Sequence, residues 1–354
     1  MKYFLLNPVL KASGIAREDS TFCRLKKLGD NTGNMVFVNA IKEQIFFEKE
    51  DWLREDMDFD DSYTYVLPCS NFLHFSNHWI EPLTDIIEKH PIKIVLVGLG
   101  TQAELNEGTQ NVVKRLSKKQ KRFFQVIAER CTSIGVRGEF TAECLEKIGV
   151  KNNKVIGCPS AYKYLDEGFP IMTTPSFEKT IVTITPSRNK LSSDILNIGM
   201  KKNSEWIMQT KDEIVSLYSN NRILKNIQME IRFPKIQWED MVKYQSQKSK
   251  IFWNFEEWNE YIENGHYTFA FGTRFHGNMM ALRNNVPTLW FIHDMRTWEL
   301  VDTLKVPGII CKNNLATETE LLENCDYSEF YKNYLDNAKK YINFLAENDI
   351  ELGA

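Results

Sequence analysis

The sequence lacks the features that mark several protein classes. No apolar run in its 354 residues approaches the roughly 20 residues of a membrane-spanning helix, so we expect no integral membrane anchor. The short apolar stretch KYFLL near the start is soon followed by charge, without a cleavage-like site, which predicts a strand and not a signal peptide. Seven cysteines without a CxxC pair, and histidines without ligand-like spacing, favour a reducing cytosol and no bound metal.

The chain also lacks an excess of positive charge, because its formal net charge is −3. This value argues against a nucleic-acid partner, and it requires that any anionic ligand be bound by a local cluster of cations. The sequence shows no internal repeat and no low-complexity tract. With 43% hydrophobic residues over this length, there is enough apolar material for two domains with cores of their own.

Apolar runs alternate with amphipathic segments along the chain. The first half predicts a helix at 111–130 and strands at 2–6, 63–70, 92–100, 132–138 and 153–160. A second series predicts strands at 180–188, 226–233, 250–254, 267–272 and 286–292, with helices near 204–218, 255–264 and 277–284. Strands that alternate with helices in this way favour α/β domains built on open parallel sheets.

We therefore predict an α/β fold of two Rossmann-like domains with a cleft between them. The domains would span residues 1–165 and 175–325, and the linker would lie within 161–178, where the pattern is interrupted by Gly-Phe-Pro. Residues 326–354 predict an amphipathic C-terminal helix that needs another surface to pack on, with an apolar face of Tyr331, Leu335, Ala338, Ile342 and Leu345. Ligands of open α/β sheets bind at the carboxyl ends of strands, so we expect functional residues just after strands.

The stretch FGTRFHGN, residues 271–278, follows one expected strand and begins a helix. A helix N-terminus presents unpaired N–H groups and the positive end of the helix dipole, which attract anions. Arg274 adds a planar fork for a carboxylate or phosphate, and His276 adds a titratable donor. The alternative is that Arg274 lies at the solvated surface and His276 caps a turn.

The stretch HDMRTWEL, residues 293–300, follows the next expected strand. It places Asp294 and Glu299, two candidates for acid–base chemistry, beside the cation Arg296. The alternative is an ordinary helix start with a solvated Arg296–Glu299 ion pair at i, i+3 spacing.

Other strand ends add polar and charged groups. Arg137 and Arg188 each follow a strand, so that four arginines occupy positions after strands. The loop LGDNTGN and the ends of two further N-terminal strands supply candidates for a second ligand: Gly29, Asp30, Asn31, Asn34, Asn71 and Gln102. Each of these segments would also serve as a plain turn.

These motifs together resemble the polysaccharide pyruvyl transferase family. The resemblance spans about residues 1–310 and rests on LGDNTGN, VLVGLGTQ, SIGVRGEFTAECLEKIGV, VIGCPS and, most specifically, the R-x-H-G segment. It implies a fold like that of two-domain GT-B glycosyltransferases, with phosphoenolpyruvate (PEP) as pyruvyl donor and a pair of sugar hydroxyls as acceptor. The product would be a pyruvate ketal on a surface glycan or its lipid-linked precursor. Two positions depart from the family pattern, since Gly138 and Cys158 stand where Asp is frequent.

The resemblance also implies roles for individual residues. Arg137, Arg274, His276 and Arg296 match positions of the family's PEP site, and Arg188 is expected beside them. His276 would act as an acid or a phosphate ligand, with Asp294 or Glu299 as the base. No cofactor is expected beyond PEP as co-substrate.

Two other functions fit the same residues. A glycosyltransferase with a nucleotide-sugar donor would use Arg274 and Arg296 for a diphosphate, and an inactive relative would serve as a scaffold in glycan assembly. The basic stretch at 114–122 is expected mainly as a solvated helix face that could also touch anionic lipid, which would place a cytoplasmic protein at the inner face of a membrane.

Overall fold

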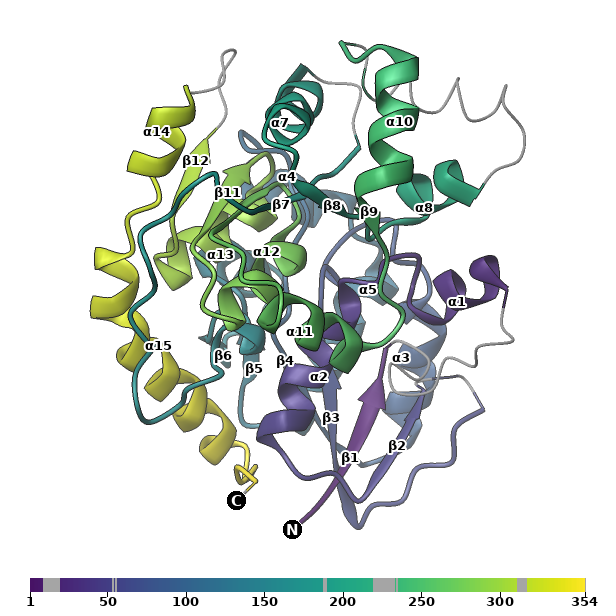
Figure 1. The fold of residues 1–354 in the computed structure, drawn as a ribbon. Coiled ribbons are helices and arrows are strands. Elements are labelled where there is room, and N and C mark those ends of the chain that lie inside the picture. Colours follow the sequence, from purple (N-terminus) through teal and green to yellow (C-terminus); the bar gives the residue numbers. More distant parts are fainter. Residues whose placement is uncertain are drawn as a thin grey trace.

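The computed structural model describes residues 1–8, 20–52, 54, 56–186, 190–218, 233, 235–310 and 317–353. Two parallel sheets, each flanked by helices, make up the molecule, and their strands follow one another along the chain (Figure 1). The expected α/β class with parallel sheets is therefore confirmed. None of the helices in these ranges is both long and apolar enough to cross a membrane.

The N-terminal sheet has the strand order β2-β1-β3-β4 and all of its pairs are parallel. The strands are β1 (Lys2–Asn7), β2 (Lys49–Trp52), β3 (Tyr63–Pro68) and β4 (Lys93–Val97). A second parallel pair, β5 (Ile134–Val136) and β6 (Asn153–Val155), continues this sheet through a bridge between Leu99 and Val136. All residues of β3 are buried, as expected for a strand covered on both faces.

The C-terminal sheet has the order β12-β11-β10-β7-β8-β9, again with parallel pairs throughout. Its strands are β7 (Thr180–Thr183), β8 (Glu205–Ile207), β9 (Ser249–Lys250), β10 (Phe269–Gly272), β11 (Thr288–Ile292) and β12 (Gly308–Ile310). The helix expected over 204–218 is wrong in its first part, because Trp206 and Ile207 are buried in β8 and the helix begins only at Lys211. Most of the strand expected at 226–233 lies outside the described residues.

Helices cover both faces of each sheet (Figure 1). Those of the first half are α1 (Thr21–Lys27), α2 (Asn34–Gln44), α3 (Ile80–Lys89), α4 (Thr109–Arg115), α5 (Lys118–Arg130) and α6 (Glu139–Lys147). Those of the second half are α7 (Lys190–Lys201), α8 (Lys211–Tyr218), α10 (Trp238–Lys248), α11 (Phe255–Glu263), α12 (Phe275–Arg283), α13 (Met295–Leu304), α14 (Glu318–Glu323) and α15 (Ser328–Glu347).

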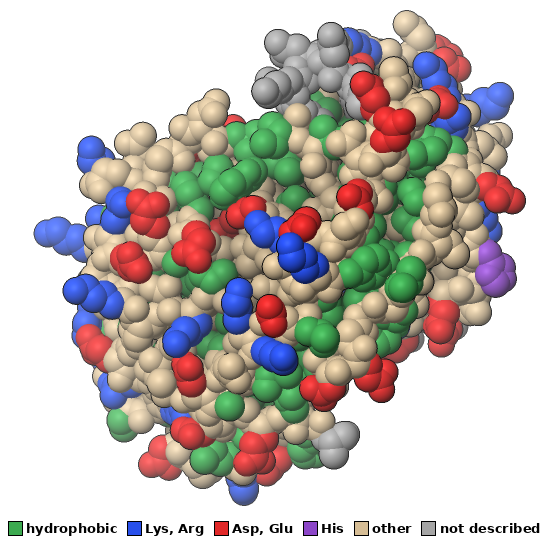
Figure 2. All heavy atoms as spheres, turned by 90° about the vertical axis from the view of Figure 1, so that its left-hand side faces the viewer, with side chains coloured by type: hydrophobic (Ala, Val, Ile, Leu, Met, Phe, Trp, Pro, Cys, Tyr) green, Lys and Arg blue, Asp and Glu red, His purple; other side chains and the backbone are tan. Residues whose placement is uncertain are grey.

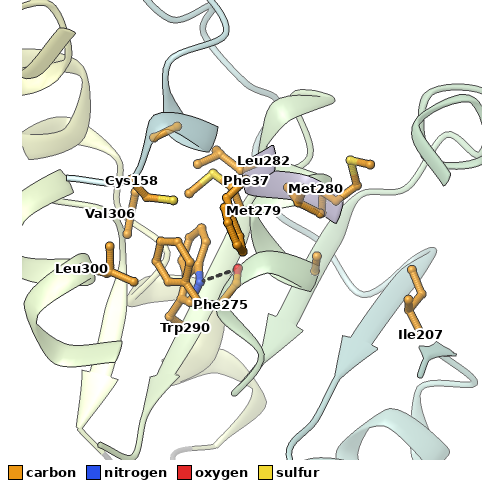
Figure 3. Packing of buried hydrophobic residues seen from close by; sticks show 14 of the residues in the cluster. Phe37, Cys158, Ile207, Phe275, Met279, Met280, Leu282, Trp290, Leu300 and Val306 are labelled. Atoms are coloured by element: carbon orange, nitrogen blue, oxygen red, sulfur yellow. Dashed lines mark hydrogen bonds between the residues drawn. The ribbon is translucent and has the colours of Figure 1, made fainter. Parts of the chain in front are cut away.

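Helix α2 joins the cores of the two halves. It packs against α12 and against the short 3-10 helix η1 (Pro159–Ala161). Phe37 of α2 lies among Phe275 and Met279 of α12 and Cys158, all in one continuous apolar cluster (Figure 3). A separate cluster fills the other face of the N-terminal sheet, beneath α3, α5 and α6.

The C-terminal helix α15 spans both halves of the molecule. Its buried face consists of Phe330, Tyr334, Asn337, Ala338, Tyr341, Phe344 and Leu345. The face expected from sequence is therefore rotated, since Leu335 is 40% exposed while the large aromatic rings point inward. Beyond the helix, Tyr3 donates a hydrogen bond to the carbonyl of Asp349, which brings the chain ends close together (Figure 1).

Charges of both signs are interspersed on the side of the molecule that carries α14 and α15 (Figure 2). The basic stretch at 114–122 is divided between α4 and α5, and three of its six basic side chains, those of Arg115, Lys119 and Arg122, pair with acids. Lys119 lies 2.7 Å from Asp85, and Arg122 lies 2.6 Å from Glu88 on the neighbouring helix α3. These ion pairs favour a solvated face for this stretch.

Asn348 anchors the end of α15 to the N-terminal sheet, and its loss should destabilise the protein. Its side chain is fully buried and accepts hydrogen bonds from the N–H groups of Thr132 and Ser133. We expect Asn348→Ala to lower the free energy of unfolding by about 2–3 kcal/mol, because buried donors lose their partner. Chemical denaturation measures this change in the free energy of unfolding. Asn333→Ala, on a more exposed turn of the same helix, should change it by less than about 0.5 kcal/mol.

Candidate active site

The turn from β10 into α12 positions Arg274 and His276. At Gly272 the backbone has φ 151°, and a Cβ atom there would lie 1.6 Å from the carbonyl oxygen of Thr183 on β7, so only glycine fits. The side chain of Asn278 then donates to the Gly272 carbonyl at 3.0 Å, which closes the turn. Arg274 stands at the N-cap of α12, where its own side chain makes no capping bond.

Arg274 is held by neighbouring groups that the sequence did not single out. Its Nε donates to the carbonyl of Ile184 at 3.0 Å, and one terminal nitrogen donates to the Thr210 hydroxyl at 2.8 Å. The same nitrogen lies 3.4 Å from the carboxylate of Glu213, which is buried. The other terminal nitrogen has no hydrogen-bond partner among the described residues. Burial lowers the pKa of Arg274, against the opposing charge of Glu213.

His276 lies between the two halves. Its ring centroid is 5.3 Å from that of Phe37 in α2, and its Nε2 is 3.5 Å from Sγ of Cys158. Burial, together with the charges of Arg137 and Arg296, lowers its pKa well below the ordinary 6.5. The imidazole is therefore neutral at pH 7 and can donate one hydrogen bond and accept another.

Arg137 enters the same region from the end of β5. Only 1% of its surface is exposed, and its guanidinium donates to the carbonyls of Gly98 and Cys69 at 2.9 and 3.0 Å. The guanidinium also lies over the ring of Phe37, 5.8 Å from its centroid. Two carbonyls and an aromatic face thus hold a cation to which no carboxylate of the described residues is bonded.

The start of α13 brings in Asp294 and Arg296. Asp294 is the N-cap of the helix, because its Oδ1 accepts from the N–H and hydroxyl of Thr297 at 2.8 and 2.7 Å. Its Oδ2 lies 3.2 Å from Arg296 and 3.5 Å from His293. Burial raises the pKa of Asp294, but Arg296, His293 and the bonds from Thr297 outweigh this and hold it below its usual value. The Nε of Arg296 is buried and has no hydrogen-bond partner within the described part of the chain.

Glu299, one turn further along α13, is buried against the N-terminal half. The hydroxyl of Thr141 donates to its Oε1 at 2.7 Å, and the Thr141 N–H donates to its Oε2 at 3.1 Å. Burial raises the pKa of Glu299 to about 7, although these bonds lower it. A side chain at position 138 would collide with this group, because a Cβ on Gly138 would lie 2.9 Å from Cβ of Glu299. Glu299 thus fills the space beside Arg137 that Gly138 leaves open.

Four of the residues expected to bind a second ligand line one cleft of about 500 Å³ in the N-terminal half: Gly29, Asn34, Asn71 and Gln102. Asp30 and Asn31 do not line it. They hold the two halves together instead, because the Lys211 N–H donates to the Asp30 carbonyl at 3.1 Å and Asn31 forms a bridge with Thr210. Arg188 lies outside the described residues.

Sequence reasoning missed Gln209, Thr210 and Glu213, which form the turn between β8 and α8. The Gln209 carbonyl accepts from the N–H of Thr32, and its side-chain nitrogen is buried beside Gly277 without a partner in the described part of the chain. The only signal for this turn was a short apolar strand, which the sequence pattern merged with the following helix. Among the described residues, no group of three or more His, Cys, Asp and Glu side chains could hold a metal ion.

Ionisation of Glu299 should lower the free energy of unfolding near neutral pH. Its pKa is raised in the folded protein, so the stabilisation it provides is present below the unfolded value of about 4.5 and is lost as the pH rises through about 7. We expect the free energy of unfolding to fall between pH 5 and 8, relative to Glu299→Gln, by a few kcal/mol. Denaturant titrations across this range measure it, with Glu139→Gln, an exposed position on α6, as the control. A constant difference between the wild type and Glu299→Gln would contradict the prediction.

His276 has Cys158 beside its ring and no carboxylate partner among the described residues, and adding one should raise the pKa of His276. The charges of Arg137 and Arg296 now act on the ring without compensation. We expect Cys158→Asp to raise this pKa by at least about one unit, because a nearby opposite charge favours the imidazolium form. Cys158→Ser, which stays neutral, should change it little. NMR titration of the histidine ring protons, with the signal assigned through His276→Gln, measures the shift.

Comparisons with known proteins identify the family of the chain. Two solved structures resemble the chain: the glycotransferase of kitacinnamycin (8% identity, TM-score 0.40, 94% of this chain and 81% of that one covered) and a UDP-glucosyltransferase from Polygonum tinctorium (9% identity, TM-score 0.36, 95% and 79% covered). At these TM-scores neither likeness bears on function. The curated proteins give no match.

A family model gives the decisive comparison. Residues 28–295, well over half of the chain, match the model described as polysaccharide pyruvyl transferase. This range includes the R-x-H-G turn, Arg137 and the loop that begins at Leu28. The chain therefore belongs to the polysaccharide pyruvyl transferase family.

Proposed function

We propose that this protein is a transferase that takes a pyruvyl group from PEP and attaches it to two hydroxyls of a sugar as a ketal. The observation that carries this proposal is the convergence of Arg137, Arg274, Arg296 and His276 from both halves of the molecule, in a chain of the pyruvyl transferase family. PEP carries a carboxylate and a phosphate, and a site for it needs several cations in one place.

Two of the arginines keep N–H groups that are available to bind an anion. The guanidinium of Arg274 keeps one terminal nitrogen without a partner in the described structure, and Arg296 keeps its Nε. The first turn of α12 adds unpaired N–H groups and the positive end of its dipole. In our proposal the phosphate and carboxylate of PEP bind across these groups, with Arg137 on the side of the N-terminal sheet.

The reaction requires the movement of two protons. One sugar hydroxyl adds to C2 of PEP while the methylene carbon gains a proton and becomes a methyl group. The second hydroxyl then replaces the phosphate at the same carbon, and the departing phosphate takes up the remaining proton. Two C–O bonds to the sugar form, and one C–O bond to phosphate breaks.

His276 is suited to one of these proton transfers once PEP is bound. In the free protein burial and the charges of Arg137 and Arg296 keep it neutral, and an anionic substrate would offset those charges and raise its pKa toward the working pH. Of the two carboxylates, Glu299 has a pKa of about 7 and can exchange a proton near neutral pH. Asp294 is ionised and committed to capping α13 and to pairing with Arg296, so we assign it to positioning Arg296.

The acceptor in this proposal is a surface glycan or its lipid-linked precursor. A lipid-linked acceptor would place the reaction in the cytoplasm at the inner face of a membrane, which the protein would reach by peripheral contact. No resident cofactor is needed, because PEP itself supplies the pyruvyl group.

Phosphate release from PEP across a panel of free and lipid-linked glycans tests this function. We expect PEP to raise the Tm of the wild type, and we expect Arg274→Ala and His276→Ala to lower the rate of phosphate release by at least about 100-fold. Arg122→Ala, which removes a surface ion pair, should leave the rate unchanged. Stabilisation by UDP-, GDP- or CMP-sugars but not by PEP would show instead that the protein uses a nucleotide-sugar donor.

A further inference from the structure

The cleft of about 500 Å³ beside the arginines has a different chemical character from the arginine site. It lies at the carboxyl ends of β1, β3 and β4 and at the start of α2, and its volume is in the usual range of about 300–1,000 Å³ for small-ligand sites. Four amide side chains line it: Asn34, Asn71, Asn77 and Gln102.

No Asp, Glu, Lys or Arg lines the cleft among the described residues. The one titratable group in its wall is His74, and burial together with the charge of Arg115 lowers the pKa of that histidine, so it is neutral at pH 7. Phe37 lines the cleft as well, and its ring separates the cleft from His276 and Arg137. The cations of the arginine site therefore do not extend into the cleft.

One polar atom in the cleft wall lacks a partner. The Nδ2 of Asn71 donates to Oε1 of Gln102 at 3.3 Å, but the Oδ1 of Asn71 is buried and accepts no hydrogen bond within the described structure. A buried acceptor without a donor costs free energy, and a rotation of the Asn71 amide toward the cleft would let a ligand hydroxyl satisfy it. A carboxylate or phosphate cannot, because an ionised oxygen has no proton to donate.

An exposed aromatic ring completes the cleft. Trp79 is 44% exposed, and its ring is held at the N-terminus of α3 by an edge contact with Phe72, 4.8 Å between centroids. A fixed, exposed indole beside several amides suits a ligand that has one apolar face and a rim of hydroxyl groups. The ring of a sugar has this combination.

We propose that this cleft binds an uncharged sugar residue, with the apolar face of the sugar against Trp79 and one of its hydroxyls donated to Asn71 Oδ1. That this sugar is the acceptor of the pyruvyl group rests on the proposed function. The cleft then selects neutral acceptors, while the anionic donor binds on the other side of Phe37. The two substrates are separated by charge, and each is excluded from the other's site.

Binding of disaccharides to the full-length protein tests the proposal without PEP. The probes are lactose, cellobiose and N,N′-diacetylchitobiose, each compared with the uronate made by oxidising one of its primary hydroxyls. Ligand-observed NMR titrations give the Kd values. We expect at least one neutral disaccharide to bind, and its uronate to bind at least tenfold more weakly.

The role of Trp79 is tested with a matched pair of surface tryptophans. Trp52 is 41% exposed on β2 and does not line the cleft. We expect Trp79→Ala to weaken sugar binding at least tenfold, Trp79→Phe to retain it within about threefold, and Trp52→Ala to leave it unchanged. Equal binding of uronates, binding that Trp79→Ala does not alter, or no binding by any of the disaccharides would each overturn the proposal.

The same variants distinguish this proposal from the proposed function. Because Trp79 lines the cleft and contacts none of the arginines of the PEP site among the described residues, PEP should raise the Tm of Trp79→Ala as much as that of the wild type. If PEP binds but neutral sugars do not bind at Trp79, the cleft proposal alone is wrong. If neutral sugars bind there and PEP does not stabilise the protein, the donor assignment alone is wrong.

Discussion

The buried carboxylate of Glu213 is the interaction on which the arrangement of the site depends. It accepts hydrogen bonds from the N–H groups of Gln209 and Thr210 and from the indole of Trp206, and thereby fixes the turn after β8. Backbone groups of that turn form hydrogen bonds with the first loop of the N-terminal half, and its Thr210 hydroxyl accepts a hydrogen bond from Arg274. The turn thereby fixes the position of Arg274 relative to the first loop of the N-terminal half. A buried charge of this kind is stable because several donors share it.

The site combines buried cations with a neutral histidine, and this determines its chemistry. Arg137 is held by two backbone carbonyls, whereas Arg274 is held by one carbonyl, the Thr210 hydroxyl and the nearby Glu213 carboxylate. The positive charges of Arg137 and Arg296 act on His276. Because buried positive charges lie close together, the empty site is poorly stabilised, and it favours the binding of an anion with more than one charged group. The adjoining cleft is lined by amides and an indole and does not require an anionic ligand. A wall formed by Phe37 separates the two environments.

Much of the fold could be predicted from periodicity, and the failures have local causes. The strands that end in Val97 and Gly272 are apolar runs with a glycine at or just after their end, and these two strands and β5 lie close to their expected positions. Strand β8 was missed because it is only three residues long and is followed, after three further residues, by a helix with similar apolar spacing. The buried face of α15 was misplaced because the expected face did not include Tyr334 and Tyr341, which are buried, and did include Leu335, which is 40% exposed.

The sequence by itself determined the α/β class, the family and the residues after the strands, since chain-local patterns encode strands, turns and glycine positions. Only the tertiary structure decided how these residues act together. Asp30 and Asn31 proved to join the two halves, and Asn71 to carry an unsatisfied acceptor in a neutral cleft. Burial and charge depend on what packs against a residue from distant parts of the chain. For that reason the neutral state of His276 and the pKa of Glu299 could not be read from their neighbours in sequence.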